Sequence, residues 1–134
     1  MQKFEILKHP ADLKIKVFGK TKEDLFLNAL LAMEEGLRPE LEGKKVKREI
    51  KIRSFDLSAL LVDFLSEALY LIQINKEIYN NIKFKKTSST GLEAELFGQK
   101  VERFGEDIKA VTHHDLDIHQ KEDGSFEATI LFDI

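Results

Sequence analysis

Residues 57–74, LSALLVDFLSEALYLIQI, influence the fold more than any other stretch of this sequence. The stretch has helical spacing and is apolar on nearly every side. Ser54 or Asp56 can cap its start. At this length, we expect the central buried helix of a domain and not a membrane span.

Working outward toward the N-terminus, the pattern predicts a second helix and three strands. Thr21 is the expected N-cap of that helix, apolar residues follow helical spacing from Leu25 to Leu37, and Gly36 and Pro39 are expected to end it. Alternating segments at 4–6 and 13–17 predict two strands before the helix, the second of them ending at Gly19, so that Asp12 lies at the turn between them. A further strand is predicted near 46–52. The N-terminal half of the chain then consists of two strand–helix units, 13–37 and 46–74.

Working outward toward the C-terminus, every segment alternates as a strand does. These segments cover 78–86, 92–100, 109–119 and 126–134, and 101–107 is expected to be a surface connection. Turns are predicted at 88–91 and 122–125, with Asp123-Gly124 typical of a type I′ hairpin. We predict the α+β class: one domain, 1–134, with two main helices packed on an antiparallel β sheet.

Composition narrows the function classes. The 134 residues include no cysteine, which excludes disulfides and zinc–thiolate sites. A net charge of −3 gives no overall basic field, so strong direct nucleic-acid binding is not expected, although 44–48 and 83–86 are locally basic. No signal-peptide pattern opens the sequence, and we expect a cytoplasmic protein without membrane attachment.

The last strand carries the first candidate site. It stays apolar to its final residue, which predicts an ordered end that holds the Asp133 carboxylate near the α-carboxylate of Ile134. If Asp12 reached the same edge, three carboxylates would form an all-oxygen site of the kind that Ca²⁺ or Mg²⁺ prefers. The alternative is a solvated strand end with an ordinary aspartate.

Two further clusters could carry chemistry. On a strand over 109–116, His113 and His114 would point to opposite faces and could not chelate one metal together, while Asp115 would share the face of His113. A polar surface strand is the alternative there. Asp63 and Glu67 lie one turn apart on the apolar helix, where a solvent-facing edge or a partner contact would account for them.

No complete catalytic set can be assembled from the sequence. It lacks a phosphate-cradling glycine loop, a serine elbow, a metalloprotease helix and the aromatic strand pattern of RNA-binding sheets. We therefore expect a protein that is not itself an enzyme. An independent metal-dependent hydrolase is disfavoured for the same reason.

Four motifs, in order, resemble the archease family across essentially the whole chain. They are the stretches HPAD at 9–12, LLVDFLSE at 60–67, KAVTHHDL at 109–116, and the final FDI at 132–134. The resemblance implies an accessory protein of tRNA splicing that helps an RtcB-type RNA ligase become guanylylated and turn over repeatedly. A chaperone-like adaptor for tRNA-modifying enzymes, such as a tRNA methyltransferase, is the alternative.

The resemblance also implies a site. It implies that Asp12, Asp133 and Ile134 bind a divalent cation, calcium or another such as magnesium. Lys109 matches a lysine important for function in the family, and His114, Asp115 and Asp63 are further candidates for ligase activation. This chain departs from many relatives in having Pro10 for threonine and His113 for tyrosine, which leaves His113 without an inherited role.

Overall fold

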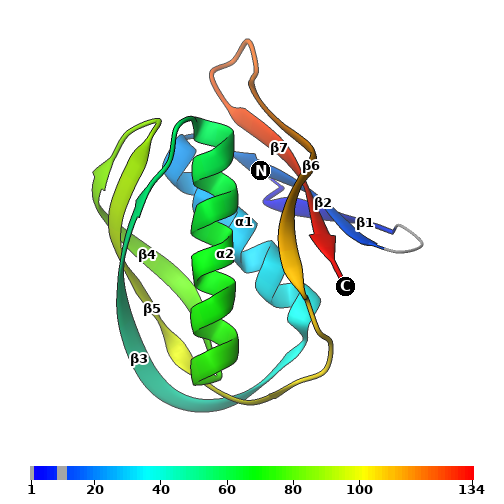
Figure 1. The fold of residues 1–134 in the computed structure, drawn as a ribbon, viewed down its shortest axis with the longest axis vertical. Coiled ribbons are helices and arrows are strands. Elements are labelled where there is room, and N and C mark those ends of the chain that lie inside the picture. Colours follow the sequence, from blue (N-terminus) through cyan, green and yellow to red (C-terminus); the bar gives the residue numbers. More distant parts are fainter. Residues whose placement is uncertain (1, 9–11) are drawn as a thin grey trace.

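Two helices lie between two antiparallel sheets (Figure 1). The computed structural model describes residues 2–8 and 12–134, with every side chain in them except those of Lys8 and Asp115. In chain order the elements are β1 (Phe4–Lys8), β2 (Asp12–Gly19), α1 (Lys22–Leu37), β3 (Pro39–Arg53), α2 (Leu57–Asn75), β4 (Glu77–Thr87), β5 (Gly91–Phe104), β6 (Ala110–Gln120) and β7 (Phe126–Asp133).

The predicted α+β class and both helices are confirmed, while the strands divide between two sheets. One sheet has the order β1-β2-β7-β6 and the other the order β3-β5-β4. α1 packs on β2 and α2 on β6, and both helices also contact β4 on the opposite side. The last strand of the chain therefore pairs with β2, one of the first.

The helices form where the sequence predicts them because their apolar faces meet in one core. Leu25, Leu30 and Met33 of α1 are fully buried, as are Phe64 and Leu65 of α2. Although α2 is long and apolar enough to match a membrane span by length and composition, its apolar face is used in this core. Its opposite side is exposed.

The helix ends differ from the predicted ones in detail. Asp56, not Ser54, caps α2, because its carboxylate accepts the Ala59 N–H at 2.8 Å. Thr21 caps α1 as expected. Gly36 does not end α1: it lies inside the helix, which ends through Arg38 in the left-handed conformation.

Two connections also differ from the sequence prediction. β5 continues to Phe104, because Val101 is buried and pairs with Leu41, so most of the expected connection at 101–107 is strand. The β6–β7 hairpin exists, but its turn is not type I′, since only Gly124 has a positive φ (88°) and Asp123 does not. The Gly124 N–H instead bonds Lys121 O at 2.9 Å, closing a tight turn that precedes the glycine.

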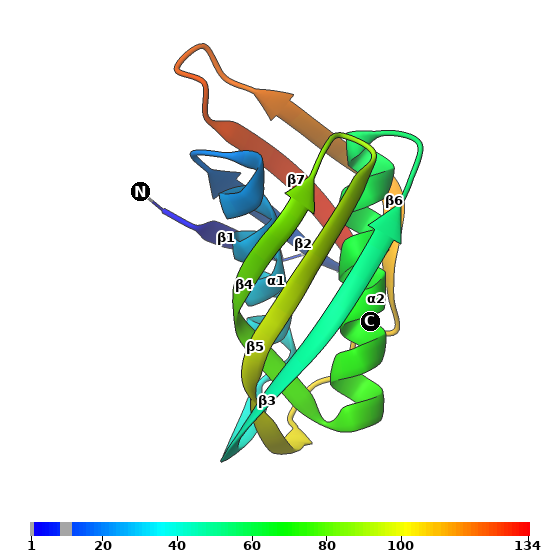
Figure 2. The ribbon, with the colours of Figure 1, turned by 90° about the vertical axis from the view of Figure 1, so that its left-hand side faces the viewer.

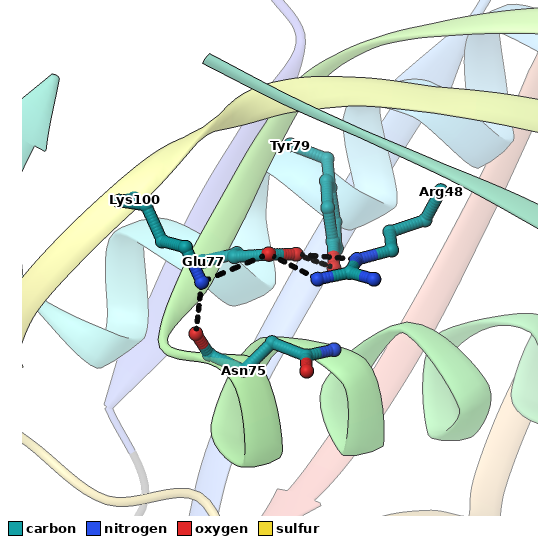
Figure 3. A network of polar contacts seen from close by, with 5 residues as sticks. All are labelled: Arg48, Asn75, Glu77, Tyr79 and Lys100. Carbon is teal, nitrogen blue, oxygen red and sulfur yellow. Dashed lines mark hydrogen bonds and ion pairs between the residues drawn. The ribbon is translucent and has the colours of Figure 1, made fainter. Parts of the chain in front are cut away.

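A buried ionic network ties α2 to the three-stranded sheet (Figure 3). Glu77 is fully buried and receives two hydrogen bonds from Arg48, at 2.6 and 2.9 Å, and one from the Tyr79 hydroxyl at 2.8 Å. Lys100 lies 3.3 Å from the same carboxylate and donates to the Asn75 carbonyl at the end of α2. Burial alone would raise the pKa of Glu77, but the bonds from Arg48 and Tyr79 hold it below its ordinary value.

A second buried carboxylate lies in a different environment. Glu34 of α1 is 4% exposed and accepts the Tyr79 N–H at 2.5 Å. No cation contacts it among the described residues, and burial raises its pKa to about 8 despite that hydrogen bond. The bond lies next to a register shift of β4, between Tyr79 and Asn81.

Candidate functional site

Asp12 and Asp133 lie directly opposite each other on neighbouring strands. Asp12 is the first residue of β2 and pairs with Asp133, the last residue of β7. Directly opposed residues of an antiparallel pair project from the same face, with Cβ atoms about 5 Å apart. Asp133 is exposed and Asp12 is half-buried, so this acidic edge is open to water. The structure thus brings together two of the three predicted ligand residues.

The acidic edge rests on a well-packed base. Leu13 pairs with Phe132, which is fully buried, and the two strands stay in register from there to the Gly19–Phe126 pair. Behind them, Leu13 comes so close to Gly36 of α1 that a Cβ there would lie 2.8 Å from its side chain. The two aspartates are therefore held at the end of a rigid ladder, not on a loose tail.

Lys109 is fixed beside the same edge through its main chain. Its N–H donates to the Asp133 carbonyl at 2.7 Å. The preceding residue, Ile108, is fully buried against the core, and its carbonyl accepts a hydrogen bond from Gln73 at 2.8 Å. The buried Ile108 side chain and the main-chain hydrogen bond to Asp133 together hold Lys109 next to Asp133. Its side chain is exposed.

The donor chemistry of the acidic edge suits a hard cation. Ile134 follows Asp133 directly and is 47% exposed. The two opposed side-chain carboxylates are oxygen donors of the kind that Ca²⁺ and Mg²⁺ favour. Over 2–8 and 12–134, no three His, Asp or Glu side chains cluster as a metal site.

The histidine motif lies beside the acidic edge but is not the regular strand that we predicted. Thr112 pairs with Leu131 and Asp117 with Thr129, so the four residues between them oppose a single residue of β7. Alternation fails across this bulge, and His113 and His114 are both exposed instead of lying on opposite faces. The His114 N–H donates to the Thr112 hydroxyl at 3.3 Å. The side chain of Asp115 lies outside the described part.

Asp63 and Glu67 belong to the exposed side of α2. Asp63 accepts a short hydrogen bond from the Ser54 hydroxyl, 2.5 Å, near the start of the helix. Glu67 is exposed one turn further on. The solvent-facing alternative therefore describes this pair, and Asp63 is bound to the connection before α2.

Sequence reasoning missed the residues that support the acidic edge. Ile108 lay between the expected connection at 101–107 and the expected strand at 109–119 and was assigned to neither, and Gly36 was interpreted as a helix end. Ile108 and Leu13 meet Gly36 only in the folded chain, because the three come from a connection, strand β2 and helix α1. The only sequence signal was an apolar residue just before Lys109.

Together these features define a class: a small α+β protein with two helices between two antiparallel sheets and an acidic site at the end of the β2–β7 ladder. The model of the Archease protein family (MTH1598/TM1083) matches residues 4–134. The chain is 34% identical to a protein archease of Methanosarcina barkeri over 145 residues, covering 99% of this chain and 97% of that protein. It is 32% identical to that of Pyrococcus furiosus, with both chains fully covered. The chain belongs to the archease family.

Solved structures share the fold. The solution structure of Methanobacterium thermoautotrophicum protein 1598 matches with a TM-score of 0.75, 26% identity and full coverage of both chains. A crystal structure of an archease from Thermotoga maritima, named as a possible chaperone, matches with a TM-score of 0.73 and 20% identity, covering 96% of this chain and 94% of that one. At that identity, the second likeness concerns the fold alone.

Proposed function

We propose that this chain is a non-catalytic cytoplasmic accessory protein of tRNA splicing that activates an RtcB-type RNA ligase, promoting its guanylylation and multiple turnover. Membership of the archease family supports this role. The observation that carries the proposal is the pairing of Asp12 with Asp133, with Lys109 bonded to the Asp133 main chain. These three positions are distant in sequence and form one surface in the fold.

We further propose that the acidic edge binds a divalent cation, calcium by preference, through Asp12, Asp133 and the carboxylate of Ile134. Like charges directly opposite each other on neighbouring strands are unfavourable, and a cation between them would remove that cost. A bound cation would supply positive charge at an exposed edge, next to the main chain of Lys109. Asp12 and Asp133 would hold the cation in a fixed place, because their strands pair in register.

The ligase proposal is tested by measuring multiple-turnover RNA ligation with the ligase limiting and this chain added. Asp12→Ala and Asp133→Ala should reduce ligation beyond the first turnover at least tenfold, because each removes a proposed cation ligand. Glu67→Ala removes an exposed carboxylate far along α2 and is the matched control, expected to behave as the native chain. Full multiple turnover with both aspartate variants would contradict the proposal.

The role of the main-chain carboxylate has its own test. Adding Gly-Ser-Gly after Ile134 displaces that carboxylate and leaves every side chain unchanged. The same tripeptide before Met1 is the control. We expect the C-terminal addition to weaken ligase activation and calcium binding, and the N-terminal addition to leave both intact. Equal behaviour of the two chains would exclude Ile134 from the site.

A chaperone-like adaptor for tRNA-modifying enzymes is the second candidate, and a specific surface favours it. Tyr70 and Ile74 lie one turn apart on the exposed side of α2, at 57% and 62% exposure, an unusual position for two large apolar side chains. If they contact a partner enzyme, Tyr70→Ser with Ile74→Ser should abolish co-purification with it, and a calcium chelator should not. Loss of binding on chelation alone would instead favour the acidic edge.

A further inference from the structure

The outer face of the three-stranded sheet is open and carries a local excess of positive charge. Figure 2 shows β3, β5 and β4 side by side with both helices behind them, and no other described element packs on their front. Seven basic and three acidic side chains lie on this face, by strand alternation and by the register shift of β4 at Lys85: Lys45, Lys47, Lys51, Arg53, Lys83, Lys85 and Lys86 against Glu49, Glu93 and Glu95. The surplus contrasts with the net charge of −3 for the chain.

Each acidic side chain of this face already forms an ion pair with a lysine of the same face. Glu95 lies 2.9 Å from Lys47, and Lys85 lies 3.4 Å from Glu49. Glu93 lies 3.8 Å from Lys86. Four cations are left over, with no ion pair to another described side chain: Lys45, Lys51, Arg53 and Lys83. They are spread along β3 and β4, on both sides of the central strand.

An aromatic side chain lies among these cations. Phe97 of β5 is half-buried, pairs with Lys47 on one side and Asn81 on the other, and is not part of the hydrophobic core. A surface hollow at this point is lined by Lys45, Asn81, Phe97 and Gln99 among others. An aromatic ring at the centre of a sheet, flanked by amide and ammonium groups, is the surface on which unpaired bases stack.

A second hollow lies on the same sheet toward the β4–β5 turn. Lys51, Arg53, Lys86 and Ser88 line it, together with Glu93, which lies 3.8 Å from Lys86. Lysine and arginine side chains are the groups that most often hold phosphate oxygens. The second hollow lies six residues from Phe97 along β5, at Gly91, which is about 20 Å of extended strand. A few linked nucleotides can span that length.

We propose that this face binds single-stranded nucleic acid, with bases on Phe97 and the phosphate backbone following Lys45, Lys51, Arg53 and Lys83. Affinity is in the micromolar range at low salt, because the overall acidic charge of the chain opposes long-range attraction. A duplex is disfavoured, since its bases are unavailable for stacking on Phe97. The proposal concerns the chain by itself and does not rest on ligase activation or on the cation at the acidic edge.

Fluorescence anisotropy with a labelled 12-nucleotide uridine RNA tests the charges. The triple variant Lys51→Gln, Arg53→Gln and Lys83→Gln should bind at least tenfold more weakly, with the slope of log affinity against log salt reduced by about two, or 0.7 per lost phosphate contact. The matched control is Lys3→Gln, Lys16→Gln and Lys20→Gln, which removes the same charge elsewhere and should stay within about twofold of the native chain. Equal losses in the two triples would overturn the proposal.

Phe97→Ala tests the stacking surface. We expect affinity to fall fivefold or more with an unchanged salt slope, because stacking and not charge is lost. Thermal unfolding of each variant verifies that it folds. A single-stranded oligodeoxyuridine of equal length should bind with comparable affinity. Absence of binding by the native chain at about 100 μM in 50 mM salt, or equal affinity for an RNA duplex, would overturn the proposal. Loss of ligase stimulation by the first triple, with no RNA binding by the native chain, would also overturn it and mark the face as a protein contact.

Discussion

The Glu77 network and the acidic edge both gather charged side chains, and they do so in opposite ways. Glu77 is fully buried and is contacted by Arg48, Lys100 and the Tyr79 hydroxyl. At the acidic edge, Asp12 and Asp133 face each other across two strands, and Asp133 is exposed to water. In the first region two cations of the chain contact a buried carboxylate; in the second two opposed carboxylates lie at an edge that is open to water. The two regions therefore differ in both burial and charge balance, as a structural network and a candidate binding site should.

Glu34 shows what a buried carboxylate does without a cation. It accepts one main-chain hydrogen bond and has a pKa raised to about 8 by burial. It is close to Glu77 in the fold, since both contact Tyr79. Because the pKa of Glu77 is lowered and that of Glu34 is raised, their effects on stability change with pH in opposite directions.

The largest expected effect tests the closed network. Glu77→Ala leaves Arg48 and Lys100 without their shared partner, and breaking a buried ion pair typically costs about 3–5 kcal/mol. Urea unfolding at pH 7 measures the loss. Glu49→Ala, which removes an exposed carboxylate of the same sheet, should change the free energy of unfolding by less than about 0.5 kcal/mol. Similar losses for the two variants would mean that the Glu77 network does not account for the loss of stability.

A pH series tests Glu34. In the unfolded chain its carboxyl ionises near 4.5, whereas in the folded chain it keeps its proton to about pH 8. Between these values the folded chain binds more protons, so the free energy of unfolding falls as pH rises. Glu34→Gln should remove this fall and be more stable than the native chain by about 2–4 kcal/mol at pH 8.5. At pH 5 the two should be similar.

Glu77 should show the opposite dependence. Its folded-state pKa lies below the ordinary value, so the stability that it contributes is present above about pH 4.5 and is lost as pH falls through the lowered pKa. The difference in the free energy of unfolding between the native chain and Glu77→Ala should therefore be large at pH 6 and smaller at pH 3. A difference that stays constant between these pH values would contradict the ionic nature of the network.

Ile108→Ala tests the base under Lys109. Ile108 is fully buried, and truncating such a side chain costs about 2–4 kcal/mol. We also expect faster amide hydrogen exchange at Lys109, because its N–H bond to Asp133 depends on that anchor. Ile74→Ala truncates an exposed isoleucine and is the matched control, with a change below about 0.5 kcal/mol. Unchanged exchange at Lys109 would show that β7 alone holds it.

The smallest stability effect belongs to the acidic edge itself. Asp133→Asn removes one of two opposed charges at an open edge, so stability without metal should rise slightly or stay within about 0.5 kcal/mol. Thermal unfolding in a chelator measures this. A loss above about 2 kcal/mol would indicate that the carboxylates are structural and that the contrast with Glu77 is wrong.

Much of the fold could be predicted from the sequence because periodicity reports which face of an element is buried. Both helices, the C-terminal hairpins and the ordered final strand came from that signal. Periodicity does not identify neighbours, so the division into two sheets and the 29-residue separation of Arg48 from Glu77 were not predictable. The bulge at 113–116 broke the alternation on which the histidine prediction depended. The sequence motifs indicated Asp12 and Asp133 as candidate ligands, but only the structure shows that they pair across β2 and β7.

Calorimetric titration of the chain with calcium tests the central claim most directly. We expect one bound ion per chain for the native protein, and at least tenfold weaker binding for both Asp12→Asn and Asp133→Asn, with Glu67→Gln unchanged. Native binding that all three variants retain, or a chain that takes up no divalent cation at millimolar concentration, would contradict the assignment of the acidic edge as a cation site.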